Sequence, residues 1–256
     1  MTFTVARSAE DASDFSEQLA ALWRGFGEIA KGPNWTPQQD EGYIRRIEDS
    51  ITGYVIERLN SRLTPSAETL ELELNKATTQ AFDGLSFEAV REQNPGWQGF
   101  AHVLQTSYMR PSLYIVAVTV GPGNTPSNLI RAFSSRNGRY ESVASAGEDF
   151  KNRRLQLFMM KPFEPDEIRF LISGLCIGSP EGLTNLVLYS FDGQRLRVVW
   201  QRDSVPNAEI SLVGRNITIS SYEPIPNKRP WVSTLETYAQ VPTGLKLLKV
   251  EHGTVQ

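Results

Sequence analysis

The sequence predicts an α+β protein that is mainly β, in which an N-terminal helical hairpin precedes antiparallel tandem β-meanders. Three observations lead to this prediction. Hydrophobic residues recur at helical spacing up to about residue 85, short alternating runs follow from about residue 86, and part of the second region repeats itself. We therefore expect a helical segment over residues 1–85, packed on a β domain over residues 86–256.

The first predicted helix covers about residues 9–31. Its hydrophobic residues recur at steps of four and three and form one stripe, namely Phe15, Leu19, Leu22, Phe26 and Ile29. Gly32-Pro33 ends it, because proline cannot continue a helix.

The second predicted helix begins at a capping-box arrangement, Thr36-Pro37-Gln38-Gln39, and reaches about Asn60. The connection to the first helix is short, so the two should form an antiparallel hairpin. Residues 67–82 are ambiguous, because their leucines fit both a strand and a helix. Their composition, rich in Ala, Glu, Leu, Lys and Gln, favours a helix.

The remainder of the chain predicts short strands separated by turn residues. The spacing leaves no room for crossover helices, so the sheets should be antiparallel. The predicted strands cover residues 98–106, 112–120, 129–134, 139–144, 154–160, 168–176, 185–191, 195–200, 208–213, 216–221, 231–239 and 245–250.

Two stretches of this region resemble each other, at about 112–165 and 168–224. Each contains apolar strands around a tight turn, Asn137-Gly138 in the first and Asp192-Gly193 in the second, and these dipeptides suit a two-residue hairpin loop. We predict that the two turns occupy equivalent places in two four-stranded meanders. Such meanders resemble the blades of β-propellers in pattern, although a sandwich or a barrel could be built from them as well.

Composition excludes several classes of protein. With 40% hydrophobic and 21% charged residues, the chain is an ordinary globular one, and a single cysteine excludes a disulfide scaffold. No apolar run is long enough to span a membrane, so we expect a soluble chain. Residues 1–8 do not resemble a secretory signal, but an exported protein lacking its leader would look the same.

The inventory of catalytic groups is thin. The two histidines are His102 and His252, and Cys176 lies between Leu175 and Ile177, where a small buried hydrophobic residue is expected. No zinc, nucleophile-elbow or phosphate-loop motif occurs, so we predict no metal, no cofactor and no catalytic residue. The visible carboxylate pairs suit turns and solvated helix faces, namely Glu71 with Glu73, Glu148 with Asp149, and Asp166 with Glu167.

Three residues are candidates for ligand contact. Trp97 and Trp231 lie beside loop signals, where an aromatic side chain can meet a ligand, and His102 lies in a predicted strand. A basic patch is also predicted, consisting of Arg131, Arg136, Arg139, Arg153 and Arg154.

The sequence favours a non-catalytic binding or interaction protein, because repeated meanders offer faces and loops while catalytic groups are few. Its partner would be a small molecule, a glycan or a protein. The first alternative is a carboxylate-dependent hydrolase that acts on a substrate such as a glycan. Nucleic-acid binding through the basic patch is the weaker alternative, since the formal net charge of the chain is −3. Oligomeric state cannot be read from the sequence.

Overall fold

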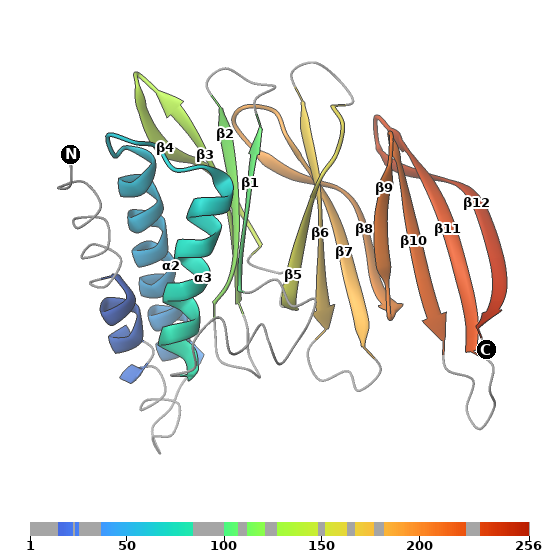
Figure 1. The fold of residues 1–256 in the computed structure, drawn as a ribbon, viewed down its shortest axis with the longest axis horizontal. Helices are drawn as coiled ribbons and strands as arrows, with labels where there is room; N and C mark the ends of the chain where they lie inside the picture. The colour runs from blue at the N-terminus through green and yellow to red at the C-terminus, as the bar shows by residue number, and fades with distance from the viewer. Residues whose placement is uncertain are drawn as a thin grey trace. The chain divides into compact units, whose positions relative to one another are not determined.

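The computed structural model describes residues 15–22, 24–25, 37–83, 100–106, 112–120, 127–147, 152–162, 167–176, 182–223 and 231–255. The chain forms two compact units, Met1–Phe150 and Lys151–Gln256. Helices come first along the chain and sheets follow (Figure 1), and the described residues form three sheets, each of four antiparallel strands. The predicted α+β class, with N-terminal helices and tandem β-meanders, is therefore confirmed.

Three helical stretches precede the sheets in the described residues. The first covers residues 15–22 and 24–25, and the rest of the predicted helix 9–31 lies outside the described residues. The second, α2, covers Pro37–Leu59, as its stripe predicts. The third, α3, covers Ala67–Asp83, so helical composition prevails over the alternating leucines. Ser66 caps α3, since its Oγ accepts a hydrogen bond from the Thr69 amide at 3.2 Å.

All twelve predicted strands overlap a strand of the structure. The first sheet has the order β1-β2-β3-β4, the second β5-β6-β7-β8 and the third β12-β11-β10-β9. The strands are β1 (Ala101–Thr106), β2 (Leu113–Val120), β3 (Ser127–Arg136), β4 (Arg139–Ala146), β5 (Asn152–Met159), β6 (Ile168–Cys176), β7 (Leu183–Phe191), β8 (Leu196–Pro206), β9 (Glu209–Val213), β10 (Asn216–Glu223), β11 (Trp231–Val241) and β12 (Gly244–Val255).

The two predicted turns occupy equivalent places, between the third and fourth strands of their sheets. Asn137 and Gly138 both have positive φ, 52° and 78°, as a tight hairpin of this type requires. Gly193 has φ 91° between β7 and β8. In the third sheet, a glycine comes just after the corresponding loop, since Gly244 is the first residue of β12 and has φ 131°.

The two predicted repeats do not begin at the first strand of a sheet. Residues 112–165 begin on β2 and run past β5, and residues 168–224 begin on β6 and run past β10. The likeness between strands detects the repetition, but it does not show which strand starts a sheet. The division between the compact units falls after Phe150, and the helices and the first sheet share one core.

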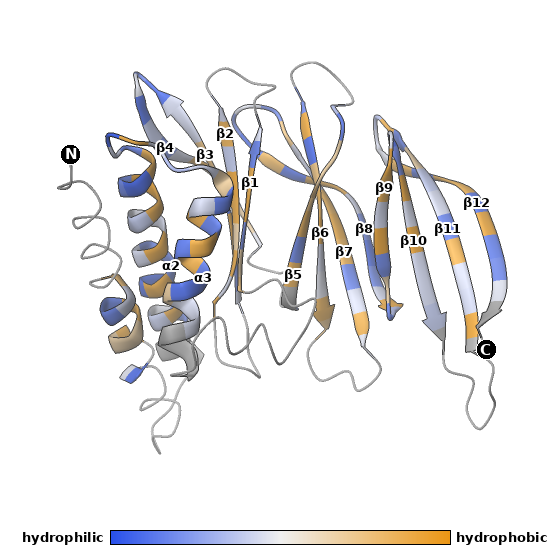
Figure 2. Ribbon diagram, in the orientation of Figure 1, coloured by the Kyte–Doolittle hydropathy of each residue, from blue (hydrophilic) through white to orange (hydrophobic). Residues whose placement is uncertain are grey.

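The core of the unit Met1–Phe150 lies between the helices and one face of the first sheet. The hydrophobic stripes of α2 and α3, visible as orange bands in Figure 2, supply Ile51, Val55 and Leu74. Val116 and Val118 of β2 meet them from the sheet. Removing these apolar side chains from water stabilises the arrangement, at roughly 1.5–3 kcal/mol for each fully buried one.

In the unit Lys151–Gln256, the second and third sheets share a second core. Leu186 and Leu188 of β7 cluster there with Ile217 and Ile219 of β10. The buried guanidinium of Arg169 on β6 donates hydrogen bonds to the carbonyl oxygens of Val241, at 2.6 Å, and Pro242, at 2.8 Å. The hairpin between β11 and β12 is thereby tied to the second sheet.

Candidate functional site

Of the three predicted ligand contacts, the structure describes the side chain of His102 alone. His102 lies on β1 and its surface is 4% exposed, with Nδ1 3.9 Å from Glu71 Oε2 on α3. Trp231 begins β11, but its side chain lies outside the described part of the structure, and Trp97 lies wholly outside it. Their role as ligand contacts stays a prediction.

The predicted basic patch falls on both compact units. Arg136 and Arg139 flank the β3–β4 turn and are exposed, and Arg136 Nε lies 3.2 Å from Glu141 Oε1. Arg131 lies further along β3 and is half-buried. Arg153 and Arg154 belong to β5 in the second unit, and their side chains lie outside the described part.

The two carboxylates of the predicted pair on α3 bind different partners. Val103 of β1 donates its amide hydrogen to Glu71 Oε2 at 2.7 Å, whereas Glu73 binds Arg58 of α2. Of the other pairs, Glu167 lies 3.0 Å from Arg169, while Asp166 and the pair Glu148 and Asp149 lie outside the described residues.

Two further polar residues have structural explanations. Asp192 accepts hydrogen bonds from the amides of Arg195 and Gln194, and these lower the pKa of its carboxyl group. Burial raises the pKa of the Cys176 thiol, which is the opposite of what a nucleophile needs. Within the described ranges, no three His, Cys, Asp or Glu side chains gather as a metal site would require, and no helix has the length and hydropathy to cross a membrane.

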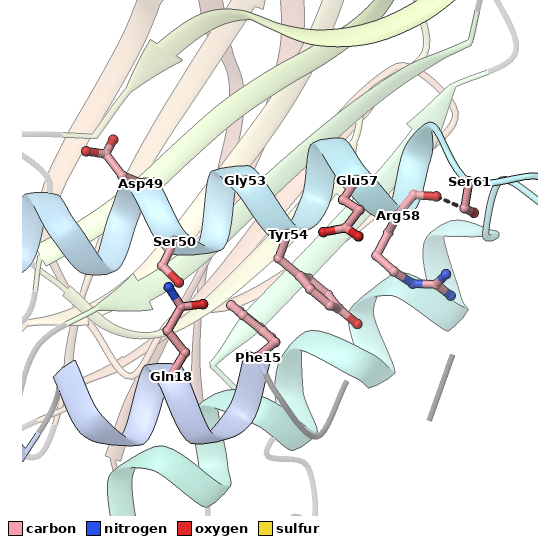
Figure 3. A pocket seen from close by; sticks show the side chains of 9 residues that line it. All are labelled: Phe15, Gln18, Asp49, Ser50, Gly53, Tyr54, Glu57, Arg58 and Ser61. Carbon is pink, nitrogen blue, oxygen red and sulfur yellow. Dashed lines mark hydrogen bonds between the residues drawn. The ribbon is translucent and has the colours of Figure 1, made fainter. Parts of the chain in front are cut away.

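A hollow of about 500 Å³ lies between the first helical stretch and α2 (Figure 3). Such a volume suits a small ligand or one or two side chains of a partner. Aromatic rings, carboxylates and small polar groups line it together, namely Phe15, Gln18, Asp49, Ser50, Gly53, Tyr54, Glu57, Arg58 and Ser61. We refer to it as the helix hollow.

The aromatic wall of the helix hollow is held firmly. The rings of Phe15 and Tyr54 stack, with centroids 4.0 Å apart and planes inclined by 8°. The Tyr54 hydroxyl donates to Glu73 Oε2 at 3.1 Å, and Arg58 donates to both oxygens of the same carboxylate, at 2.8 and 2.6 Å. Burial raises the pKa of Tyr54, and the hydrogen bond to Glu73 raises the pKa of Arg58. The phenol therefore stays neutral and the guanidinium stays charged.

The remaining charged groups of the helix hollow are acidic. Asp49 and Glu57 are exposed, while the charge of Arg58 is already balanced by Glu73. A Cβ atom added at Gly53 would meet no atom within 4 Å, so this position faces open space. Exposed carboxylates for which the described residues show no ion pair attract cationic groups, and the Phe15–Tyr54 stack beside them, whose residues are 5% and 7% exposed, offers an apolar contact.

Sequence reasoning missed the helix hollow. Phe15 and Tyr54 fit the hydrophobic stripes of their helices, so their periodicity indicated only core packing. The available signal was Gly53, since a glycine inside a helix is costly without a reason of space or packing.

Comparisons with known proteins identify no family. No family model and no curated protein matches the chain. Among solved structures, it is similar to the GH93 α-L-arabinofuranosidase of Fusarium graminearum, solved in complex with arabinobiose. The identity is 13%, the TM-score is 0.31, and the match covers 56% of this chain and 45% of the enzyme. The chain thus spans less than half of that protein, and the helix hollow is interpreted from its own geometry.

Proposed function

We propose that the protein is a binding protein and that the helix hollow takes a cationic group attached to an apolar body. The observation that supports this most is that the exposed carboxylates of Asp49 and Glu57 line the same hollow as the Phe15–Tyr54 stack. An amine would pair with the carboxylates, while its apolar part would fill the space above Gly53 and contact the accessible part of the aromatic stack.

Phenethylammonium is a suitable probe, with the neutral phenethyl alcohol and the anionic phenylacetate as controls. At low salt, we expect the ammonium compound to shift the amide NMR signals of residues 15–22 and 49–61, and the other two compounds to do so much less. Equal shifts from all three would contradict a cation site.

Two matched glycine variants test where the probe binds. Gly53→Leu fills the helix hollow, whereas Gly42→Leu adds the same side chain to α2 at a position that also has no atom within 4 Å. Both should raise helix stability, by about 0.5–1 kcal/mol. Only Gly53→Leu should abolish binding of the ammonium compound, and loss of binding in both variants would refute the proposed location.

A charge series tests the chemistry. Changing Asp49→Asn together with Glu57→Gln keeps the shape of the rim and should weaken probe binding about tenfold. Glu41→Gln removes one exposed carboxylate from the same helix outside the helix hollow and should leave binding nearly unchanged. Equal weakening by the two changes would indicate a diffuse charge effect.

A further inference from the structure

The third sheet ends in a long strand whose outer edge is open to solvent. β12 is twelve residues long and is the outermost strand of its sheet, where it pairs with β11 (Figure 1). Every residue from 246 to 253 is exposed. Within the described ranges, no side chain bonds to the outer backbone groups of this stretch. An edge of this kind is a template for pairing with another strand.

The side chains of β12 strengthen this interpretation. Three large apolar residues are exposed on it, Leu247, Leu248 and Val250, at 44%, 55% and 41%. The opposite edge of the same sheet, β9, has only five residues, which is a usual means of discouraging edge pairing. β12 is longer and bears exposed apolar side chains, and its protection is limited to Lys246, Lys249 and one register irregularity.

We propose that β12 pairs with β12 of a second copy of this chain, antiparallel and centred on Val250. A two-fold axis through this residue places Val250 opposite Val250 of the second copy, and Lys249 opposite its Glu251 on the same face. The axis repeats each contact, so the interface gains two pairs of opposite charge and one apolar pair. Cross-strand pairs of both kinds stabilise antiparallel sheets.

The charge pattern selects this register over its neighbours. Centring the pair on Lys249 or on Glu251 would place like charges opposite each other, which is destabilising. A centre between Leu248 and Lys249 would also join opposite charges, Lys246 with Glu251. It would, however, put the irregularity of β12, where the register shifts between Thr237 and Tyr238 of β11, at the middle of the interface.

Lys249 and Glu251 can also form their ion pairs between two copies instead of within one. Within one chain, Lys249 Nζ lies 2.8 Å from Glu251 Oε1, and both side chains are about half exposed. They already lie on one face of β12, because they are two residues apart. The second copy would convert this exposed pair into a four-member charge cluster across the two-fold axis.

Sedimentation of the full chain over a wide range of concentration tests the proposal. We expect a weak monomer–dimer equilibrium at low salt, because a single strand pair buries less area than a standard interface. Lys249→Glu and Glu251→Lys should each weaken it about tenfold, since each puts like charges in opposition. A chain that stays monomeric at all concentrations would overturn the proposal and leave the edge to a different partner.

Mixing the two variants separates the interface from internal effects. Equimolar Lys249→Glu and Glu251→Lys should associate as strongly as the unchanged chain, because each variant supplies the charge that the other needs. The internal pair of each chain stays broken in the mixture, so it cannot account for such a rescue. If the mixture associates no better than its components, the proposed register is wrong.

Lys246→Glu is the matched control. In the Val250-centred register, Lys246 lies beyond the irregularity at Leu248 and away from the central charged pairs, so its substitution should change association less than twofold. A larger effect of Lys246→Glu than of Lys249→Glu would move the centre of the interface to between Leu248 and Lys249. Equal effects would indicate non-specific charge attraction and would also overturn the proposal.

Discussion

The edge strands of the first and third sheets differ in whether side chains bond to their outer backbone groups. In the first sheet, side chains from the helical layer bond to the backbone of both edge strands, β1 and β4. In the third sheet, the described residues leave the outer edge of β12 exposed from residue 246 to 253. The N-terminal helical segment therefore does more than cover a hydrophobic face, since its side chains also bond to backbone groups of Ala101, Val103 and Tyr140 at the two edges of the sheet.

In the first sheet, one asparagine side chain bonds to the backbone at each edge. The Asn75 amide group receives hydrogen bonds from the amides of Phe100 and Ala101, at 2.6 and 2.9 Å, and donates to the Ala101 carbonyl at 2.8 Å. Asn60 does the same for Tyr140 of β4, accepting from its amide and donating to its carbonyl, both at 2.8 Å. A side-chain amide can thus imitate one residue of a neighbouring strand.

Loss of the Asn75 amide should have the largest effect. Asn75 is 1% exposed, so Asn75→Ala leaves two amide hydrogens and one carbonyl of the β1 edge without their partner in a buried place. We expect a loss of about 3 kcal/mol in the free energy of unfolding. Urea denaturation of the full chain measures it. Lys76→Ala, at an exposed position of the same helix, should cost less than about 0.5 kcal/mol.

Asn60→Ala tests the edge of β4 in the same way, with a smaller expected loss of stability. Asn60 is half-buried, so water can replace part of what Asn60→Ala removes, and we expect a loss of about 1–2 kcal/mol. Hydrogen exchange of the Tyr140 amide should accelerate. Arg62→Ala, exposed two residues further on, is the control and should leave this amide as it was. An unchanged exchange rate in Asn60→Ala would show that the bond does not protect the edge.

The sequence predicts the elements well because their signals are local. The stripe of α2 and the Asn137-Gly138 turn each depend on neighbouring residues, and both are found where the sequence places them. The edge contacts join residues far apart in the chain, such as Asn60 and Tyr140. An asparagine after a helix indicates only a helix end, so nothing local distinguishes Asn60 as a partner of a strand.

The helix hollow escaped sequence analysis for a similar reason. Its two aromatic residues come from separate helices, and each fits a hydrophobic stripe that has a sufficient explanation in packing. The stacking of Phe15 on Tyr54 depends on how the first helical stretch lies against α2, which periodicity does not fix. The third meander went unrecognised because its β11–β12 loop is Pro242-Thr243 and lacks the Asn-Gly or Asp-Gly dipeptide of the two earlier turns.

The smallest expected effect concerns Glu71, whose carboxylate binds the backbone of β1 near Asn75. Burial raises the pKa of Glu71 above its ordinary value, partly offset by the hydrogen bond from the Val103 amide, and the charge of Glu68 adds to the rise. The folded chain therefore holds this proton more tightly than the unfolded chain. Ionised Glu71 costs stability at neutral pH, and the cost disappears as the pH falls below the ordinary carboxyl range.

Glu71→Gln should remove this cost while its amide oxygen still accepts the Val103 hydrogen. We expect a gain of less than about 1 kcal/mol at pH 7, shrinking toward pH 4, in urea denaturation at several pH values. Glu73→Gln, two residues further along α3, should instead destabilise at pH 7, because it breaks the paired bonds to Arg58. A gain from Glu71→Gln that did not vary with pH would mean that improved packing, and not the removal of a buried charge, explains it.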